Sequence, residues 1–296
     1  MVLSSSHVYA LWAMSRPSQL ALIALVYTLG ALIAIQTVQL DLASLLGGLT
    51  ALLPVAVSVH YVNEYADYQT DSLTDRTPFS GGSGALQRTG LPRRFAWRAA
   101  WPALGVGVTA AIFCVAHGFS LVTLGLLGSI AVLGWQYSVG PLQLVWRGFG
   151  EVTNAILGGI LLPLYGAATQ TGSLSPTVAL TMIPFTLLVL VNLLATHWPD
   201  CEADAAVGKS TLPTRWGSTR LRQAHAGLTV LAGVALLGLT GTVIPTLVTV
   251  ASIPAFVVAI WAFRRYTRQR SPFPSVAAMV TLALCQTAGW LWLLAV

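Results

Sequence analysis

Carboxylate side chains are scarce in this sequence, and their spacing is unusual. Seven of the nine acidic residues fall in two short clusters. The clusters consist of Glu64, Asp67, Asp71 and Asp75, and of Asp200, Glu202 and Asp204. Asn63, Asp67 and Asp71 follow one another at intervals of four residues, and the second cluster repeats that interval. If these segments are helical, each set lies on one face of its helix.

This spacing is unfavourable unless a cation compensates for it. Like charges four residues apart destabilise a helix by roughly a few tenths of a kcal/mol, and carboxylates at the edge of an apolar segment cost more. Mg²⁺ prefers oxygen ligands and is usually held by one or two carboxylates together with substrate phosphates. Two such clusters facing each other would suit a diphosphate bridged by magnesium. Solvated helix ends and the cation relay of a transporter are the alternative interpretations.

The composition of the whole sequence is that of a membrane protein. Of its 296 residues 55% are hydrophobic and only 8% are charged, whereas a soluble globular domain has roughly a quarter charged residues. Several apolar runs reach the roughly 20 residues that cross a bilayer. We therefore predict an all-α integral membrane protein that forms a single domain over residues 1–296. The apolar runs predict a nine-helix transmembrane bundle, with helices over residues 19–38, 42–65, 95–116, 119–137, 148–168, 176–198, 223–239, 243–263 and 275–294.

The positive charges give this bundle an orientation. With nine crossings, all fifteen lysine and arginine residues fall on one side of the membrane. We therefore predict a multi-pass protein of the cell membrane. The positive-inside rule places its N-terminus and its acidic clusters on the cytoplasmic side. The formal net charge of +6 is an orientation signal and needs no nucleic acid partner. On the same argument Arg264, Arg265, Arg268 and Arg270 serve orientation or lipid headgroup contact.

Both clusters carry a family resemblance. Residues 63–71, Asn-Glu-Tyr-Ala-Asp-Tyr-Gln-Thr-Asp, resemble the NDxxDxxxD motif of the UbiA superfamily of intramembrane prenyltransferases. Residues 200–204, followed by Gly-Lys-Ser-Thr at 208–211, resemble its second DxxxD motif. Residues 76–84 and 137–151 are similar to the branch that includes the 1,4-dihydroxy-2-naphthoate prenyltransferases of menaquinone synthesis. The resemblance covers essentially the whole chain and also implies nine helices.

The resemblance implies a reaction and a set of site residues. An isoprenoid diphosphate would ionise with the help of Mg²⁺, and an aromatic acceptor would capture the carbocation in a cavity on the cytoplasmic side. The implied metal ligands are Asn63, Asp67, Asp71, Asp200 and Asp204. The implied diphosphate-binding residues are Lys209, Arg76, Arg147 and Asn63. The implied catalytic residues are Asp67, Asp71, Asp200, Asp204 and the phenol Tyr137.

Two positions depart from the family pattern. Glu64 replaces the usual aspartate and has a longer reach, and His197 stands where many relatives have asparagine. His197 could be a general base, a neighbour of the metal or a polar residue at the interface, and Glu151 begins the fifth predicted helix near the same cavity. Three functions are compatible with the sequence: an aromatic prenyltransferase, a related enzyme with another acceptor or a membrane terpene cyclase, and a cation-coupled transporter. The absence of a clear internal repeat argues against transport.

Overall fold

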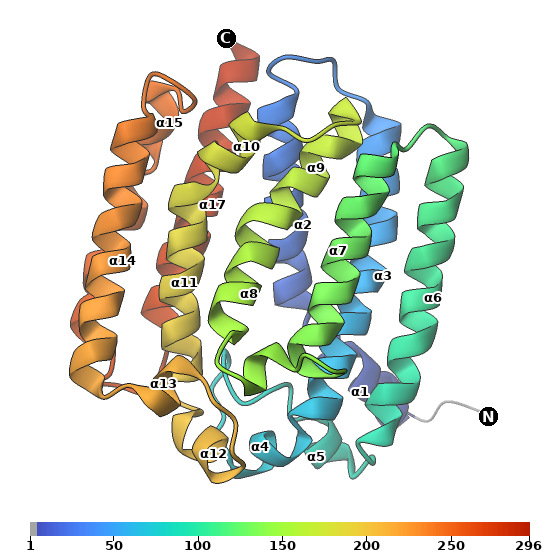
Figure 1. The fold of residues 1–296 in the computed structure, drawn as a ribbon, viewed down its shortest axis with the longest axis vertical. Coiled ribbons are helices and arrows are strands. Elements are labelled where there is room, and N and C mark those ends of the chain that lie inside the picture. Colours follow the sequence, from blue (N-terminus) through green and yellow to red (C-terminus); the bar gives the residue numbers. More distant parts are fainter. Residues whose placement is uncertain (1–4) are drawn as a thin grey trace.

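The computed structural model describes residues 5–296 as a bundle of helices that run side by side (Figure 1). The long elements are α2 (Pro17–Ala34), α3 (Leu42–Ala66), α6 (Arg94–Ala116), α7 (Leu121–Ser138), α11 (Ile183–His197), α14 (Ser218–Leu239), α16 (Ile253–Arg265) and α17 (Phe273–Ala295). Between α7 and α11 the chain forms α8 (Gly150–Ile156), the π-helical turn Leu157–Leu161 and α9 (Leu162–Thr171) without a break. The prediction of an all-helical bundle is confirmed.

Short helices connect the long ones. They are α1 (Ser5–Met14), α4 (Tyr68–Leu73), α5 (Ala85–Thr89), the 3₁₀ turn Leu144–Trp146, α10 (Pro176–Thr181), α12 (Cys201–Ala206), α13 (Leu212–Arg215) and α15 (Thr246–Ala251). Of these, α4, α5, α12 and α13 gather at one end of the bundle, and the C-terminus lies at the opposite end (Figure 1). The acidic clusters, at the ends of α3 and α11, therefore meet at a single end of the molecule.

Seven helical stretches within residues 5–296 are long and apolar enough to cross a membrane. They are Ser5–Ala34, Leu42–Ala66, Arg94–Ala116, Leu121–Ser138, Gly150–Thr171, Thr246–Arg265 and Phe273–Ala295. The predicted helix over 176–198 is divided at Met182, because Pro184 lies in the first turn of α11 and has no backbone N–H to continue the ladder. The helix predicted over 223–239 corresponds to α14, whose first turns carry Arg220 and Arg222.

Small residues let the central helices approach closely. A Cβ added to Gly30 on α2 would collide with the backbone of Pro163 on α9, and one on Gly166 would collide with the backbone of Tyr27. Such contacts between small residues hold transmembrane helices together where lipid supplies no hydrophobic drive. The buried hydroxyl of Tyr27 donates to the Leu45 carbonyl oxygen at 2.9 Å, so this polar group is satisfied inside the bundle.

Candidate active site

The first acidic cluster lies where α3 passes into α4. Asp67 separates the two helices, but the backbone N–H of Asp67 donates to the carbonyl of Asn63 at 2.9 Å and that of Asp71 to the carbonyl of Asp67 at 2.8 Å. The helical hydrogen-bond pattern thus continues through the kink. The Asn63 side chain donates to Asp67 Oδ2 at 2.8 Å. Burial raises the pKa of Asp71, and the nearby carboxylates of Asp67 and Glu64 raise it further.

The second cluster opens α12. Asp200 precedes the helix, and the backbone N–H of Asp204 donates to the Asp200 carbonyl at 2.8 Å. Asp204 is 1% exposed, and burial raises its pKa. Burial likewise raises the pKa of Asp200 to about 6. Asp200 Oδ2 accepts a hydrogen bond of 3.2 Å from the backbone N–H of Gly81, in the loop that follows the first cluster.

Lys209 joins the two clusters. Its Nζ donates to Asp67 Oδ1 at 3.1 Å and lies 3.4 Å from Asp204 Oδ1. The ammonium is buried and lies 5.9 Å from the centre of the Trp146 ring. Burial opposes the charge, but the two carboxylates outweigh it and raise the pKa of Lys209. One cation from the second motif therefore contacts an aspartate of its own cluster and another that lies 142 residues before it in the chain.

The glycine-rich loop, residues 74–84 between α4 and α5, lies against Asp71 and Glu64 of the first cluster. Arg76 donates through Nε to the Gly81 carbonyl at 2.8 Å and through Nη2 to the Gly82 carbonyl at 2.7 Å. Gly82 has a φ of 62°, and a Cβ at this position would collide with the Asp71 carboxylate. The guanidinium of Arg76 thus holds the loop against Asp71 in this structure.

Glu64 forms its hydrogen bonds and its ion pair with residues outside the two acidic clusters. It is 2% exposed, and its Oε1 pairs with Arg16 Nη2 at 2.6 Å. The backbone N–H of Ser83 donates to Oε1 at 2.8 Å and the Ser83 hydroxyl to Oε2 at 2.7 Å. Arg16 also donates to Asn63 Oδ1 at 2.9 Å. The longer side chain of Glu64 therefore ties the α1–α2 turn to the glycine-rich loop.

Tyr137 and Arg147, the two remaining predicted site residues, differ in burial: Tyr137 is partly buried and Arg147 is exposed. Tyr137, on the last turn of α7, interacts electrostatically with Lys209 and Asp67, so it borders the carboxylate site. Arg147 follows the 3₁₀ turn and has an exposed side chain. Its backbone forms an isolated parallel bridge with Ser210, beside Lys209. The 139–149 connection therefore lies against the second motif.

A second buried pair lies beside the clusters. Glu151, in the first turn of α8, is 0% exposed. Its Oε1 lies 3.1 Å from His197 Nδ1 and accepts a hydrogen bond of 2.7 Å from the backbone N–H of Leu212. Both departures that the sequence marks, Glu64 and His197, therefore have polar partners that are at least partly buried.

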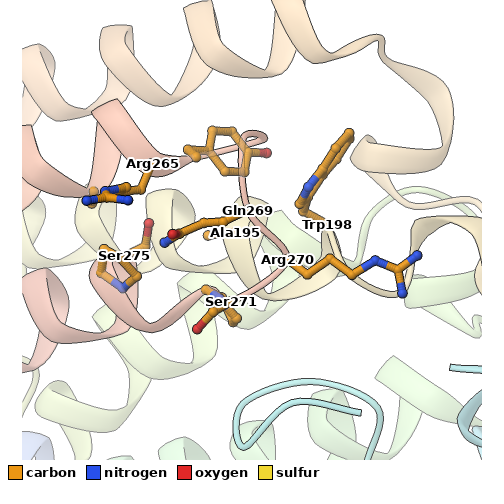
Figure 2. Close-up of a pocket in the computed structure, with 11 residues that line it drawn as sticks. Ala195, Trp198, Arg265, Gln269, Arg270, Ser271 and Ser275 are labelled. Atoms are coloured by element: carbon orange, nitrogen blue, oxygen red, sulfur yellow. The ribbon is translucent and has the colours of Figure 1, made fainter. Parts of the chain in front are cut away.

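The structure gives Arg270 a contact beyond the orientation or lipid contact that the sequence predicts for it. Its guanidinium pairs with Asp75 at 2.7 Å and lies 3.6 Å from Glu202, the outer members of the two clusters. Figure 2 shows Arg270 extending from the connection between α16 and α17, next to a pocket with a volume of about 10 Å³. Nearby, the ring of Phe79 stacks on that of Phe273, the first residue of α17, with the ring centres 5.8 Å apart. No local pattern marks Arg270, because both partners lie far away in the sequence.

The carboxylates fit a magnesium–diphosphate complex better than a metal site made by protein alone. Within residues 5–296 no group of three histidine, cysteine, aspartate or glutamate side chains could hold a metal ion by itself. The donors are hard oxygens. Within the described residues the buried Asp200 Oδ1 has no hydrogen-bond partner, and Asp204 Oδ1 has only its ion-pair contact with Lys209. Mg²⁺ characteristically takes only one or two carboxylates and completes its shell with phosphate and water. These donors suit that arrangement.

Known proteins share this sequence pattern and this fold. A model of the UbiA prenyltransferase family matches residues 24–294. The 1,4-dihydroxy-2-naphthoate octaprenyltransferase of Bacillus subtilis (strain 168) is 27% identical over 281 residues, which are 94% of this chain and 88% of the relative. Two solved structures show how far the fold is shared. A UbiA homolog from Archaeoglobus fulgidus bound to GPP and Mg²⁺ superposes with a TM-score of 0.71 at 15% identity, covering 95% of this chain and 98% of that one.

The apo structure of a UbiA homolog from Aeropyrum pernix K1 also gives a TM-score of 0.71, at 16% identity over 90% of this chain and 95% of that one. Likeness at this level of identity concerns the fold, while the family match concerns the sequence along almost its whole length. The chain is therefore an enzyme that belongs to the UbiA prenyltransferase family, in which a prenyl group passes from an isoprenoid diphosphate to an acceptor.

Proposed function

We propose that this enzyme transfers a polyprenyl group to an aromatic, dihydroxynaphthoate-like acceptor in a magnesium-dependent reaction of quinone synthesis. The observation that carries the proposal is the buried Lys209 between Asp67 and Asp204, because it brings both acidic motifs to one point. The Bacillus subtilis relative supports the acceptor class. The Archaeoglobus fulgidus homolog supports magnesium and an isoprenoid diphosphate as ligands.

The proposed roles follow from the charges at the site. The residues that would hold magnesium, together with the diphosphate, are Asn63, Asp67, Asp71, Asp200 and Asp204. When bound, the metal would offset the charge that develops on the leaving diphosphate. Lys209, Arg76 and Arg147 are the proposed diphosphate contacts, Lys209 as a point charge and the arginines through paired N–H groups.

The protein would align the two substrates and shield the reacting atoms from water. The C–O bond of the allylic diphosphate breaks, its electron pair leaves with the diphosphate, and a ring carbon of the acceptor forms the new bond to the prenyl carbon. Because the carbocation is short-lived, the ring must already be in place. The glycine-rich loop, held by Arg76 and Glu64, covers the carboxylates and would limit the entry of water. Tyr137 would line the space in which the cation forms.

We also propose that the bundle crosses the cell membrane nine times, with the N-terminus and the site in the cytoplasm. In this topology α11 and α14 are the two crossings added to the seven apolar stretches, and α14 packs along α11 in the bundle. The basic residues of the connections at the site end support this orientation. The prenyl chain would lie among the helices while the acceptor enters from the cytoplasmic side.

The product identifies the acceptor. Purified enzyme is incubated with Mg²⁺, a labelled polyprenyl diphosphate and either dihydroxynaphthoate, hydroxybenzoate or no acceptor, and the products are analysed by mass spectrometry. We expect a prenylated naphthoquinol. If a cyclised hydrocarbon formed without an acceptor is the sole product, the enzyme is a terpene cyclase and the proposed acceptor is wrong. A prenylated hydroxybenzoate alone would keep the reaction class and change the acceptor.

A further inference from the structure

The buried carboxylate of Glu151 is not accounted for by diphosphate binding. It belongs to neither acidic cluster, is 0% exposed, and its Oε2 is buried without a hydrogen-bond partner in the described structure. The ion pair that it forms is with His197. A buried carboxylate is costly unless a positive group compensates for it. Glu151 therefore favours a positive charge on the His197 ring.

This pair lies beside the region in which the diphosphate would bind. Helix α8 packs against α11, whose last residue is His197. Four charged groups lie within electrostatic range of the imidazole. They are Glu151 in α8, Asp200 just before α12, Asp204 in α12 and Lys209 in the loop after α12. Because Nδ1 faces Glu151, Nε2 is the ring nitrogen that remains for another partner.

Tyr137 links this pair to the carboxylate site. Its phenol lies within electrostatic range of Lys209, which favours the phenolate, and of the carboxylates of Asp67, Glu151 and Asp204, which oppose it. The same phenol is therefore within range of the proposed diphosphate-binding residue Lys209 and of Glu151, the partner of the His197 imidazole. The position suits contact with a second substrate.

We propose that His197 is the general base for the aromatic acceptor, taking its hydroxyl proton at Nε2, and that Glu151 is the positioning residue that orients the imidazole through Nδ1. The proposal rests on the aromatic acceptor of the proposed function. Removing the proton makes the ring more electron-rich when the carbocation forms. Glu151 holds the imidazole in one tautomer and stabilises the imidazolium, as a buried acid does in a catalytic triad.

The acceptor in this step is a phenolic ring. The hydroxyl proton moves to Nε2, and the freed electron pair drives a ring carbon to bond with the prenyl C1 as the C1–O bond breaks. The resulting dienone loses its ring hydrogen as a proton, and its oxygen recovers the proton from His197. One diphosphate and one proton are released, and no oxidant or reductant is consumed. A ring with a carboxylate at that carbon would release carbon dioxide in place of the ring proton.

The test measures two reactions on the same preparations of purified enzyme with Mg²⁺. One is prenylation of the aromatic acceptor, and the other is release of diphosphate from the prenyl substrate without acceptor. We expect His197→Asn, which keeps a polar side chain, to lower prenylation about 10²-fold more than it lowers diphosphate release. His117→Asn, at the opposite end of the bundle, serves as the matched control and should change neither rate.

The pH profile separates catalysis from a structural role. In the wild type the ratio of prenylation to diphosphate release should fall at acid pH as His197 becomes protonated, and this limb should vanish in His197→Asn. In Glu151→Gln the limb should persist with its midpoint at lower pH, since the imidazolium has lost its carboxylate. Taking the ratio cancels the effect of acid on the diphosphate site.

Two results would overturn the proposal. The first is an equal loss of prenylation and diphosphate release in His197→Asn and His197→Gln, which would make the residue a structural support. The second is an unchanged acid limb in both variants. A wild-type enzyme that releases diphosphate but prenylates no aromatic ring would instead refute the proposed acceptor, and the base with it.

Discussion

At the scale of single residues, the site is organised around one buried ammonium. Lys209 lies between Asp67 and Asp204 and forms an ion pair with each of them. In low-dielectric surroundings such a pair interacts far more strongly than at a wet surface. When Mg²⁺ and the diphosphate bind, these carboxylates would give up part of their contact with Lys209 and contact the metal and the diphosphate. Because Lys209 keeps one carboxylate when the other is replaced, we expect a single replacement to affect turnover more than folding.

Replacing either carboxylate tests the prediction. Asp67→Ala or Asp204→Ala should lower turnover by about 10²–10³-fold or more, because charge on the leaving diphosphate is no longer offset. The protein should stay folded and inserted, as judged by size-exclusion chromatography in detergent. EDTA should inactivate the wild type, and added Mg²⁺ should restore it.

Asp41→Ala provides the matched control, because this aspartate caps α3 at the far end of the same helix. Losing the cap should cost about 1 kcal/mol of stability and leave turnover near the wild-type value. Substantial activity in both Asp67→Ala and Asp204→Ala would refute the two-cluster site.

At the scale of elements, the glycine-rich loop is held by groups from several separate segments. Ser83 donates to the buried Glu64, and Gly81 donates to Asp200. At the outer edge Arg270 pairs with Asp75, whose side chain is 88% exposed. Exposed ion pairs contribute little, whereas breaking a buried one leaves an uncompensated charge. The buried contact should therefore dominate.

Limited proteolysis with trypsin can compare the two contacts. Glu64→Gln should speed cleavage at Arg88 several-fold, because Arg16 loses its counter-charge and the loop opens more often. Asp75→Asn removes a carboxylate from the same loop but from its exposed edge, so its cleavage rate should match the wild type. Equal cleavage of Glu64→Gln and wild type would show that the Glu64 contacts do not hold the loop.

At the scale of the whole molecule, charge and architecture agree. The connections at the site end and the helix turns beside them carry all fifteen lysines and arginines, while the opposite connections carry none. Under the positive-inside rule so uneven a distribution of positive charge favours the proposed orientation, with the basic end in the cytoplasm. The site, the basic loops and the proposed entry of the acceptor then share one side.

A reporter fusion tests the topology. Gly172, in the connection between α9 and α10, lies at the end opposite the acidic clusters. Fusions at this residue should report a location outside the cytoplasm, and fusions at Gly90, in the connection after the first cluster, should report the cytoplasm. A cytoplasmic signal from Gly172 would refute the proposed orientation.

The sequence by itself determined the class of molecule and predicted the chemistry of its site. Apolar run length requires a membrane bundle, and acids four residues apart at two helix ends indicate a cation and a phosphorylated substrate. These features are local, because helical periodicity and side-chain type suffice to infer them. The family resemblance inferred from the motifs is confirmed by the match over residues 24–294.

Only the tertiary structure decided which groups pair. The contacts of Lys209 with Asp67, of His197 with Glu151 and of Arg270 with Asp75 and Glu202 join segments that are distant in the chain. Nothing in the local sequence separates Arg270 from the arginines that orient the bundle. Long-range pairing is set by how the helices pack and where their ends meet, so a side chain's partner follows from the fold and not from its neighbours in sequence.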